Sequence, residues 1–351
     1  MSKLAKISLL ILALLCIEAP RSNAALRWLE TDCDFGLWHE EAGPRTMQAR
    51  FINTGPDDVV IFNVKASCGC TSAKWSDDPI APGDTAVILI TYDPYMRPGR
   101  FEKSVTVHTH DGTRQRITIH GNVLGTPESL ASLYPVEAGR MRLSDSVLDL
   151  GEVEEGRVPN GFLNAYILGP DSVKPIVNTP NSAITVKKSA KAAAPGDLVT
   201  FNLFADTRAL GEYGPVELPV NFSAGEDSES AIVKVRIFVK PDRNRLLAMQ
   251  KGKNPRVSAD STPNPLEIKD GHLEGEIELR NDGDAPLAIL RVWSKSLAIE
   301  NIKLPKPIKP GKTGIVKFTA PAATGISRHE ISVITNDPDR PIISFTRVIN
   351  N

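Results

Sequence analysis

The chain repeats itself at a fixed interval, and this repetition constrains its fold more than any other feature. The stretch Asn53-Thr54-Gly55 recurs as Asn281-Asp282-Gly283, and Pro79-Ile80-Ala81-Pro82-Gly83 recurs as Pro307-Ile308-Lys309-Pro310-Gly311. Both recurrences have the same offset of 228 residues, without a gap. In each copy the Pro-Gly turn leads into an alternating apolar run, which is typical of a strand with one buried face.

A more divergent copy lies between these two. It has Ala194-Pro195-Gly196 before the apolar run 198–205, and Leu150-Gly151 echoes Phe35-Gly36 of the first copy. Each copy contains short apolar runs separated by Gly, Pro, Asn or Asp, a pattern of strands and turns. The sequence therefore predicts an all-β protein of three tandem immunoglobulin-like antiparallel β-sandwich units.

The composition of the chain places the boundaries between these units. The predicted segments are a signal peptide (1–24), unit 1 (25–125), a linker (126–141), unit 2 (142–240), a second linker (241–255) and unit 3 (256–351).

The first segment has the pattern of a secretory signal peptide. Lys3 and Lys6 precede the apolar run 7–15, and small residues at Ser22 and Ala24 favour cleavage after Ala24. No later run approaches the roughly 18 apolar residues of a membrane span, so none is expected in the mature chain. We therefore expect export to the periplasm, or to the outside or the cell surface.

The charge and motif content exclude several classes of function. The chain has 41 Lys and Arg against 42 Asp and Glu, and this balance excludes a strongly basic nucleic-acid binder. Gly-x-Ser-x-Gly, His-Glu-x-x-His and phosphate-binding Gly-x-x-x-x-Gly-Lys-Ser motifs are absent from the sequence. No catalytic residue, cofactor site or metal site is predicted, and the chain is not expected to be an enzyme.

Cys33, Cys68 and Cys70 form the candidate disulfide or thiol site, since Cys16 would leave with the signal peptide. Period-2 alternation puts Cys33 on the same apolar face as Phe35 and Leu37, so it should point inward. A bridge from Cys33 to Cys68 or Cys70 would close a loop of about 35 residues and stabilise the fold by roughly 3–4 kcal/mol. The sequence does not choose the partner.

Two other interpretations of the cysteines stay open. Thiolates could bind Zn²⁺ or Cu(I), although Cys-x-Cys is shorter than the usual zinc spacing. Alternatively, Gly69 could let the sulfurs of Cys68 and Cys70 meet in a small ring that exchanges readily with other thiols.

Three histidines lie near one another in a predicted hairpin. Pairing Val107 with Ile117 implies a turn at 111–113 and places His108 opposite Arg116. His120 then falls opposite Ser104, several residues away, so we expect a solvent-facing surface and no metal site.

Two motifs link the chain to a known family. Asn53-Thr54-Gly55, Ser67-Cys68-Gly69-Cys70-Thr71 and the Pro-Gly of 79–83 resemble the repeats of the bacterial domain-of-unknown-function family 1573. The stretch 334–341 is similar to a late turn of that family and of hydin-like and major-sperm-protein-like immunoglobulin folds. The resemblance implies an exported β-sandwich without an established activity. Unit 3 departs from it, with Ser296-Leu297-Ala298 in place of Cys-Gly-Cys.

We therefore expect a non-enzymatic binding or scaffolding protein of the cell envelope, with a protein or another envelope component as partner. The loop 67–75 of unit 1 is the predicted contact. The alternatives are a thiol–disulfide or metal-handling protein that uses Cys68 and Cys70, and an envelope assembly chaperone.

Overall fold

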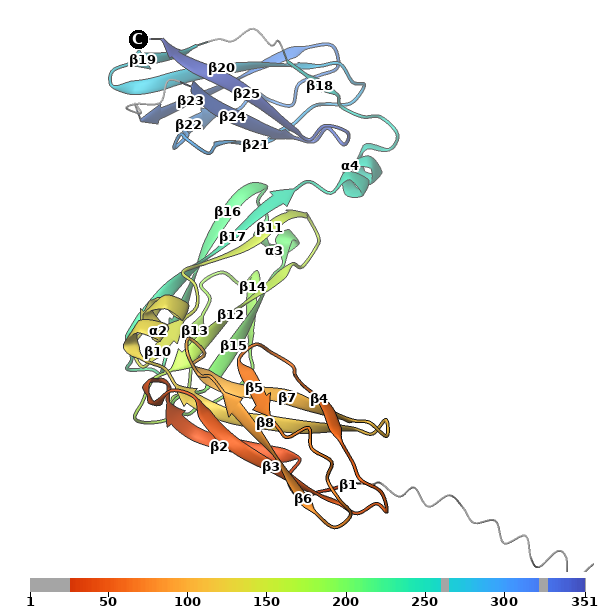
Figure 1. The fold of residues 1–351 in the computed structure, drawn as a ribbon. Helices are drawn as coiled ribbons and strands as arrows, with labels where there is room; N and C mark the ends of the chain where they lie inside the picture. The colour runs from red at the N-terminus through yellow and green to blue at the C-terminus, as the bar shows by residue number, and fades with distance from the viewer. Residues whose placement is uncertain (1–25, 260–264, 322–327, 351) are drawn as a thin grey trace, which may run out of the picture. The chain divides into compact units, whose positions relative to one another are not determined.

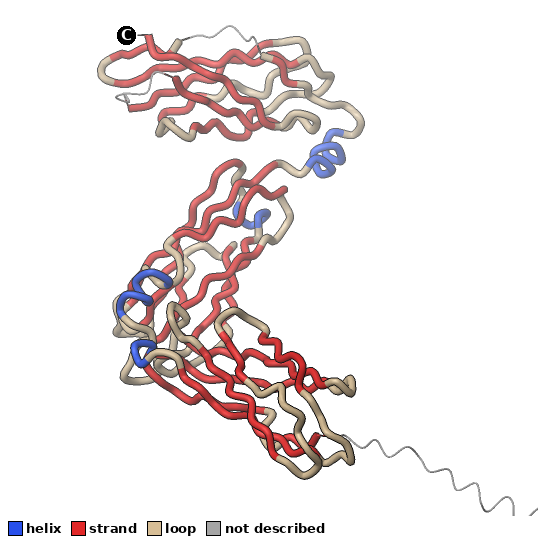
Figure 2. Tube along the Cα trace, in the orientation of Figure 1, coloured by secondary structure: helices blue, strands red, loops and turns tan. Residues whose placement is uncertain are grey.

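The computed structural model describes residues 26–259, 265–321 and 328–350, and they form β-strands and a few short helices (Figures 1 and 2). The chain divides into two compact units, 1–133 and 134–351. The predicted signal peptide and its cleavage after Ala24 lie outside the described residues. Among the residues that are described, no helix is long and apolar enough to cross a bilayer.

The first compact unit holds one sandwich of two four-stranded sheets. One sheet has the order β1-β3-β6-β5 and the other β2-β8-β7-β4. The bounds are β1 Leu26–Trp28, β2 Asp32–His39, β3 Arg45–Asn53, β4 Ile61–Ala66, β5 Thr71–Lys74, β6 Thr85–Tyr92, β7 Gly99–Thr109 and β8 Arg114–Leu124, with the 3-10 helix η1 Glu40–Ala42 and the helix α2 Pro127–Leu133. Aromatic residues fill the core between the sheets, where Tyr92 stacks on Phe101 at 3.7 Å.

The second sandwich lies at the start of the second compact unit. Its sheets have the orders β14-β15-β12-β10-β9 and β11-β17-β16-β13. The bounds are β9 Val136–Ala138, β10 Met141–Leu143, β11 Val147–Glu154, β12 Asn160–Ile167, β13 Ile176–Asn178, β14 Ile184–Lys188, β15 Leu198–Ala205, β16 Gly214–Ser223 and β17 Ser230–Lys240, with α3 Thr207–Leu210. The segments predicted as linkers contain secondary structure: α2 and β9 lie within 126–141, and α4 (Arg243–Gln250) lies within 241–255.

The third sandwich forms from one long sheet that folds over its own core. Its order is β21-β24-β25-β19-β20-β23-β22, with β18 also paired to β20. The bounds are β18 Val257–Ser258, β19 Leu266–Lys269, β20 His272–Asn281, β21 Ile289–Ser294, β22 Glu300–Lys303, β23 Thr313–Pro321, β24 Arg328–Thr335 and β25 Ile342–Asn350. The all-β sandwich prediction is confirmed, with one difference: each sandwich also has a parallel pair, β2–β8, β11–β17 or β19–β25.

The 228-residue repeat extends to matching side-chain hydrogen bonds in the first and third sandwiches. The buried Asn53 donates from Nδ2 to the carbonyls of Asp57 and Ile80, both at 2.8 Å. Asn281 donates in the same way to Ala285 (2.7 Å) and Ile308 (2.8 Å). Each asparagine therefore ties two carbonyls of its turn to one buried side chain, and the carbonyls of Ile80 and Ile308 also accept from a backbone N–H.

Two details of the predicted first sandwich are wrong. Gly36 has a φ of 69° and forms a bulge in β2, so Leu37 is 58% exposed and Trp38 takes the inward position. In the β7–β8 hairpin, His108 lies opposite Arg114, two residues from the predicted partner. The turn starts one residue earlier than predicted because Asp111 accepts hydrogen bonds from the two threonines that flank it.

Candidate functional site

The Cys-Gly-Cys sequence forms the corner at which the first sandwich passes from one sheet to the other. β4 ends at Ala66 in one sheet, and β5 begins at Thr71 in the other. Ser67 fixes the start of the corner, since its N–H donates to the Ser104 carbonyl (2.9 Å) and its Oγ accepts from the Ser104 N–H (3.0 Å). At the end of the corner, the Cys70 carbonyl accepts from the Asp93 N–H (2.9 Å). We call residues 67–71 the cystine corner.

Cys68 and Cys70 are joined to each other by a disulfide. Cys70 is buried in the core, whereas Cys68 is partly exposed. Gly69 between them is exposed, and no atom lies within 4 Å of the position that a Cβ would occupy. The Thr71 hydroxyl lies 3.3 Å from Cys68 Sγ and 3.9 Å from Cys70 Sγ. Cys70 is therefore anchored in the core, and Cys68 packs against that core, partly exposed, beside a hydroxyl.

Cys33 takes no part in this bridge, and the predicted link from Cys33 to one of the other cysteines is absent. Cys33 points inward, as predicted, and is a buried free thiol. It lies on β2, while the corner follows β4, and these are the two outer strands of one sheet. Three strand spacings separate them, about 14 Å, which is too far for a disulfide. Burial raises the pKa of the Cys33 thiol, and the carboxylates of Glu30 and Asp32 raise it further.

The equivalent corner of the third sandwich is built differently. Ser296 stands at the position of Cys68, and its Oγ lies 2.9 Å from Nδ1 of the buried His329. Leu297 stands at the position of Gly69 and is 7% exposed, packed in the core. An inward leucine fills this corner, where the first sandwich has a cystine.

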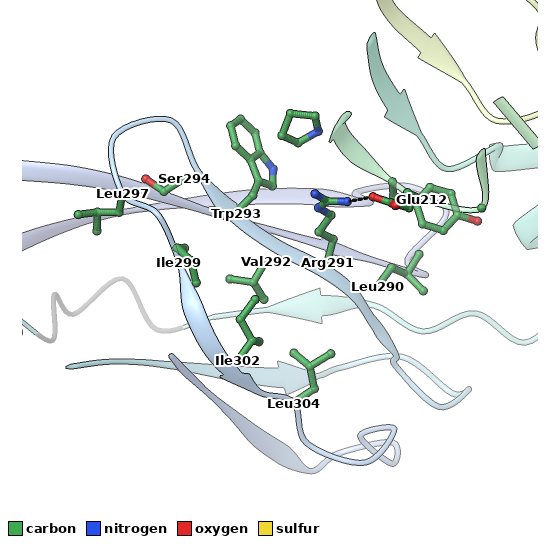
Figure 3. Close-up of a pocket in the computed structure, with 13 residues that line it drawn as sticks. Glu212, Leu290, Arg291, Val292, Trp293, Ser294, Leu297, Ile299, Ile302 and Leu304 are labelled. Carbon is green, nitrogen blue, oxygen red and sulfur yellow. Dashed lines mark hydrogen bonds and ion pairs between the residues drawn. The ribbon is translucent and has the colours of Figure 1, made fainter. Parts of the chain in front are cut away.

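A pocket lies in the second compact unit (Figure 3). Its lining is mainly aliphatic, and its two charged residues, Glu212 and Arg291, pair with each other at 2.7 Å.

His120 lies beside two carboxylates of the first sandwich. Its Nε2 is 3.2 Å from Asp32 Oδ1, and its Nδ1 is 3.5 Å from Asp34 Oδ1. On the neighbouring strand it lies opposite Glu102, so the predicted pairing with Ser104 is wrong. Within the described residues, no group of three or more His, Cys, Asp or Glu side chains could hold a metal ion.

The sequence interpretation missed two features of these sites. The proximity of Thr71 to both sulfurs depends on the turn geometry, and no sequence signal indicates it. The aliphatic side chains that line the pocket could have been found by comparing the two copies position by position, since Leu297 replaces Gly69 and Ile302 replaces Lys74.

Comparison with known proteins shows a similarity between the first sandwich and one protein family. Residues 26–123 match the model of DUF1573, described as a protein of unknown function. The first sandwich resembles this family. This resemblance was expected from the Cys-Gly-Cys and Pro-Gly motifs, and the match covers the whole cystine corner. It includes less than a third of the chain, so the second and third sandwiches lie outside it.

Other comparisons are weaker. No curated protein matches the chain. A protein of unknown function from Porphyromonas gingivalis W83 is 14% identical over 61% of this chain and 99% of its own, with a TM-score of 0.27. The secreted serine protease VesC from Vibrio cholerae is 12% identical over 62% of this chain and 52% of its own, with a TM-score of 0.30. Similarities this weak do not bear on function.

Proposed function

We propose that the chain is an exported, non-enzymatic binding protein that contacts its partner through the cystine corner and the following residues up to Trp75. The observation that supports this proposal is the exposed Gly69, held between two bridged cysteines with open space around it. A bridge that closes only three residues removes little entropy from the unfolded chain. Its main effect is to hold the loop in one shape, and a loop that is already ordered loses less entropy on binding.

Export is part of the proposal, and it rests on the sequence. The positive residues Lys3 and Lys6, the apolar run and the small residues before the expected cleavage site have the order of a signal peptide. A disulfide also suits an oxidising compartment. The partner is then a protein or another component met in the periplasm or at the cell surface.

The test is capture of binding partners from an envelope fraction by the full-length mature chain. Cys68→Ser/Cys70→Ser should lose the partner that the wild type retains, while Ser296→Ala, which changes the matching position of the third sandwich, should retain it. The proposal is wrong if the double variant stays folded and captures the same partner equally well. Circular dichroism of each variant supplies the check on folding.

Thiol–disulfide exchange is the second candidate, because Cys68 is partly exposed and Thr71 lies beside both sulfurs. An external thiolate would attack Cys68 Sγ, form a mixed disulfide there and release Cys70 as a thiolate. The Thr71 hydroxyl could donate a hydrogen bond to that thiolate. A second-order rate constant with reduced glutathione that falls about tenfold in Thr71→Val would favour this candidate. Equal rates in both proteins would remove it.

A further inference from the structure

The third sandwich has an open side. β21 and β22 are the two ends of its single long sheet, and among the described strands neither pairs with anything on its outer side. At one end of this side, just before β21 and a few residues after β22, Leu287 and Ile308 join the two segments by a single backbone bridge. A free strand edge presents unpaired N–H and C=O groups, which can pair with an added strand.

Aliphatic side chains line the space between these two strands. We call this set the seam; its members are Leu290, Val292, Leu297, Ile299, Ile302 and Leu304. Val292 and Leu297 belong to the core, but Ile302 is 40% exposed and Leu304 is 46% exposed. Figure 3 shows Val292, Ile302 and Leu304 on the opposite side of β21 from the Trp293 ring. The seam therefore continues the core into solvent.

The sandwich scaffold does not require an apolar seam. At the offset of 228 residues, the first sandwich has Lys74 in place of Ile302 and Ser76 in place of Leu304. Both are exposed there, and the strands around them are formed just as well. Leaving apolar surface in water is unfavourable, and such a patch commonly marks a contact surface.

The net charge of the segment around the seam differs between the third and the first sandwich. Residues 295–312 carry five lysines against one acidic residue, Glu300, whereas 67–84 of the first sandwich carry Lys74 against three aspartates. All five lysines are exposed, and none forms an ion pair within the part of the chain that the structure describes. They are Lys295, Lys303, Lys306, Lys309 and Lys312. Glu267, Glu274 and Glu276 lie around a hollow that Lys303 also lines, so the excess of positive charge belongs to the segment 295–312, and this segment favours an anionic partner.

We propose that the seam is the docking groove for an extended segment of a partner protein in which apolar and acidic residues alternate. In β22 and just beyond it, Ile302 and Leu304 alternate with Lys303. A strand added beside β22 has the same period of two. It would place its apolar side chains in the seam and its carboxylates beside the lysines. This site is separate from the cystine corner and does not depend on the function proposed for that corner.

The experiment uses the full-length mature chain and fluorescein-labelled ten-residue peptides, measured by fluorescence anisotropy. One peptide alternates Val with Glu, a second alternates Val with Lys, and a third alternates Ser with Glu. The Val/Glu peptide should bind at least tenfold more tightly than either of the other two. Ile302→Lys/Leu304→Ser, which installs the residues of the first sandwich, should weaken its binding at least tenfold.

A matched control is the exchange Val87→Lys/Leu89→Ser in the first sandwich. Val87 and Leu89 are each 37% exposed, close to the exposure of Ile302 and Leu304. It should leave Val/Glu binding unchanged, and both variants should keep the circular dichroism of the wild type. The proposal is overturned if the Val/Glu peptide does not bind, or if Ile302→Lys/Leu304→Ser binds it as the wild type does. It is equally overturned if that variant instead abolishes self-association in sedimentation or binding to phosphatidylglycerol vesicles.

Discussion

In the first sandwich the corner between β4 and β5 is tied by a disulfide, whereas the equivalent corner of the third sandwich is filled by the core side chain of Leu297. The strands that frame the two corners correspond, and the buried asparagines Asn53 and Asn281 make the same hydrogen bonds. The scaffold therefore tolerates different fillings of this corner. The cystine is therefore an addition to the fold and not a condition for it.

The largest expected effect concerns the core role of Leu297. Leu297→Ala removes a buried side chain and should destabilise the third sandwich by about 2–5 kcal/mol. Gly69→Ala, at the matching position of the first sandwich, adds a methyl group to open space and should change stability by no more than about 0.5 kcal/mol. Hydrogen exchange of each sandwich within the full chain measures both. Equal losses of stability in Leu297→Ala and Gly69→Ala would contradict the claim that a core side chain fills only the corner of the third sandwich.

The shared asparagine tests what the two sandwiches have in common. Asn53→Ala and Asn281→Ala each take the side-chain partner from one carbonyl (Asp57 or Ala285) and one N–H (Gly55 or Gly283). Each variant should therefore cost its own sandwich about 2–3 kcal/mol. Protection from hydrogen exchange should fall in the first sandwich for one variant and in the third for the other. A large loss at only one site would mean that the two copies are not supported in the same way.

Removing the bridge should have a smaller effect. Because the ring contains three residues, reducing the Cys68–Cys70 bridge should destabilise the first sandwich by about 1.5 kcal/mol or less. A bridge over the 35-residue loop would contribute about twice as much by the same relation. Thermal unfolding of the oxidised chain and of the reduced chain supplies the measurement. A loss above about 3 kcal/mol would show that the bridge supports the whole sandwich.

The position of Cys33 predicts the smallest effect, a dependence on alkaline pH. Burial raises the pKa of its thiol in the folded chain, so its contribution to stability is complete below the unfolded pKa, about 8.5. That contribution is lost as the pH rises through the folded pKa. The folded chain should therefore react with iodoacetamide at pH 8 at least tenfold more slowly than the unfolded chain. Equal labelling rates would place Cys33 at the surface.

The sequence was sufficient for the parts of the fold that depend on local patterns. The repeat at 228 residues located the matching turns, and the alternation around Cys33 and Phe35 placed both side chains inward. It failed at Leu37, because a bulge at Gly36 interrupts the alternation without changing the residue pattern.

The disulfide partner could not be predicted for a different reason. Which cysteines meet depends on the strand order, and β2 and β4 are neighbours in neither sequence nor sheet. The seam of the third sandwich depends in the same way on two strands, β21 and β22, that the folded sheet brings to its open side.

Disulfide mapping of the unreduced chain tests whether Cys68 and Cys70 are bridged to each other and Cys33 is free. The purified mature protein is unfolded without a reductant, alkylated and digested, and its peptides are identified by mass spectrometry. The structure predicts one alkylated cysteine, Cys33, and one peptide in which Cys68 and Cys70 remain bridged. A bridge from Cys33 to either of the others would contradict it, since the cystine would then tie the core together and not the corner.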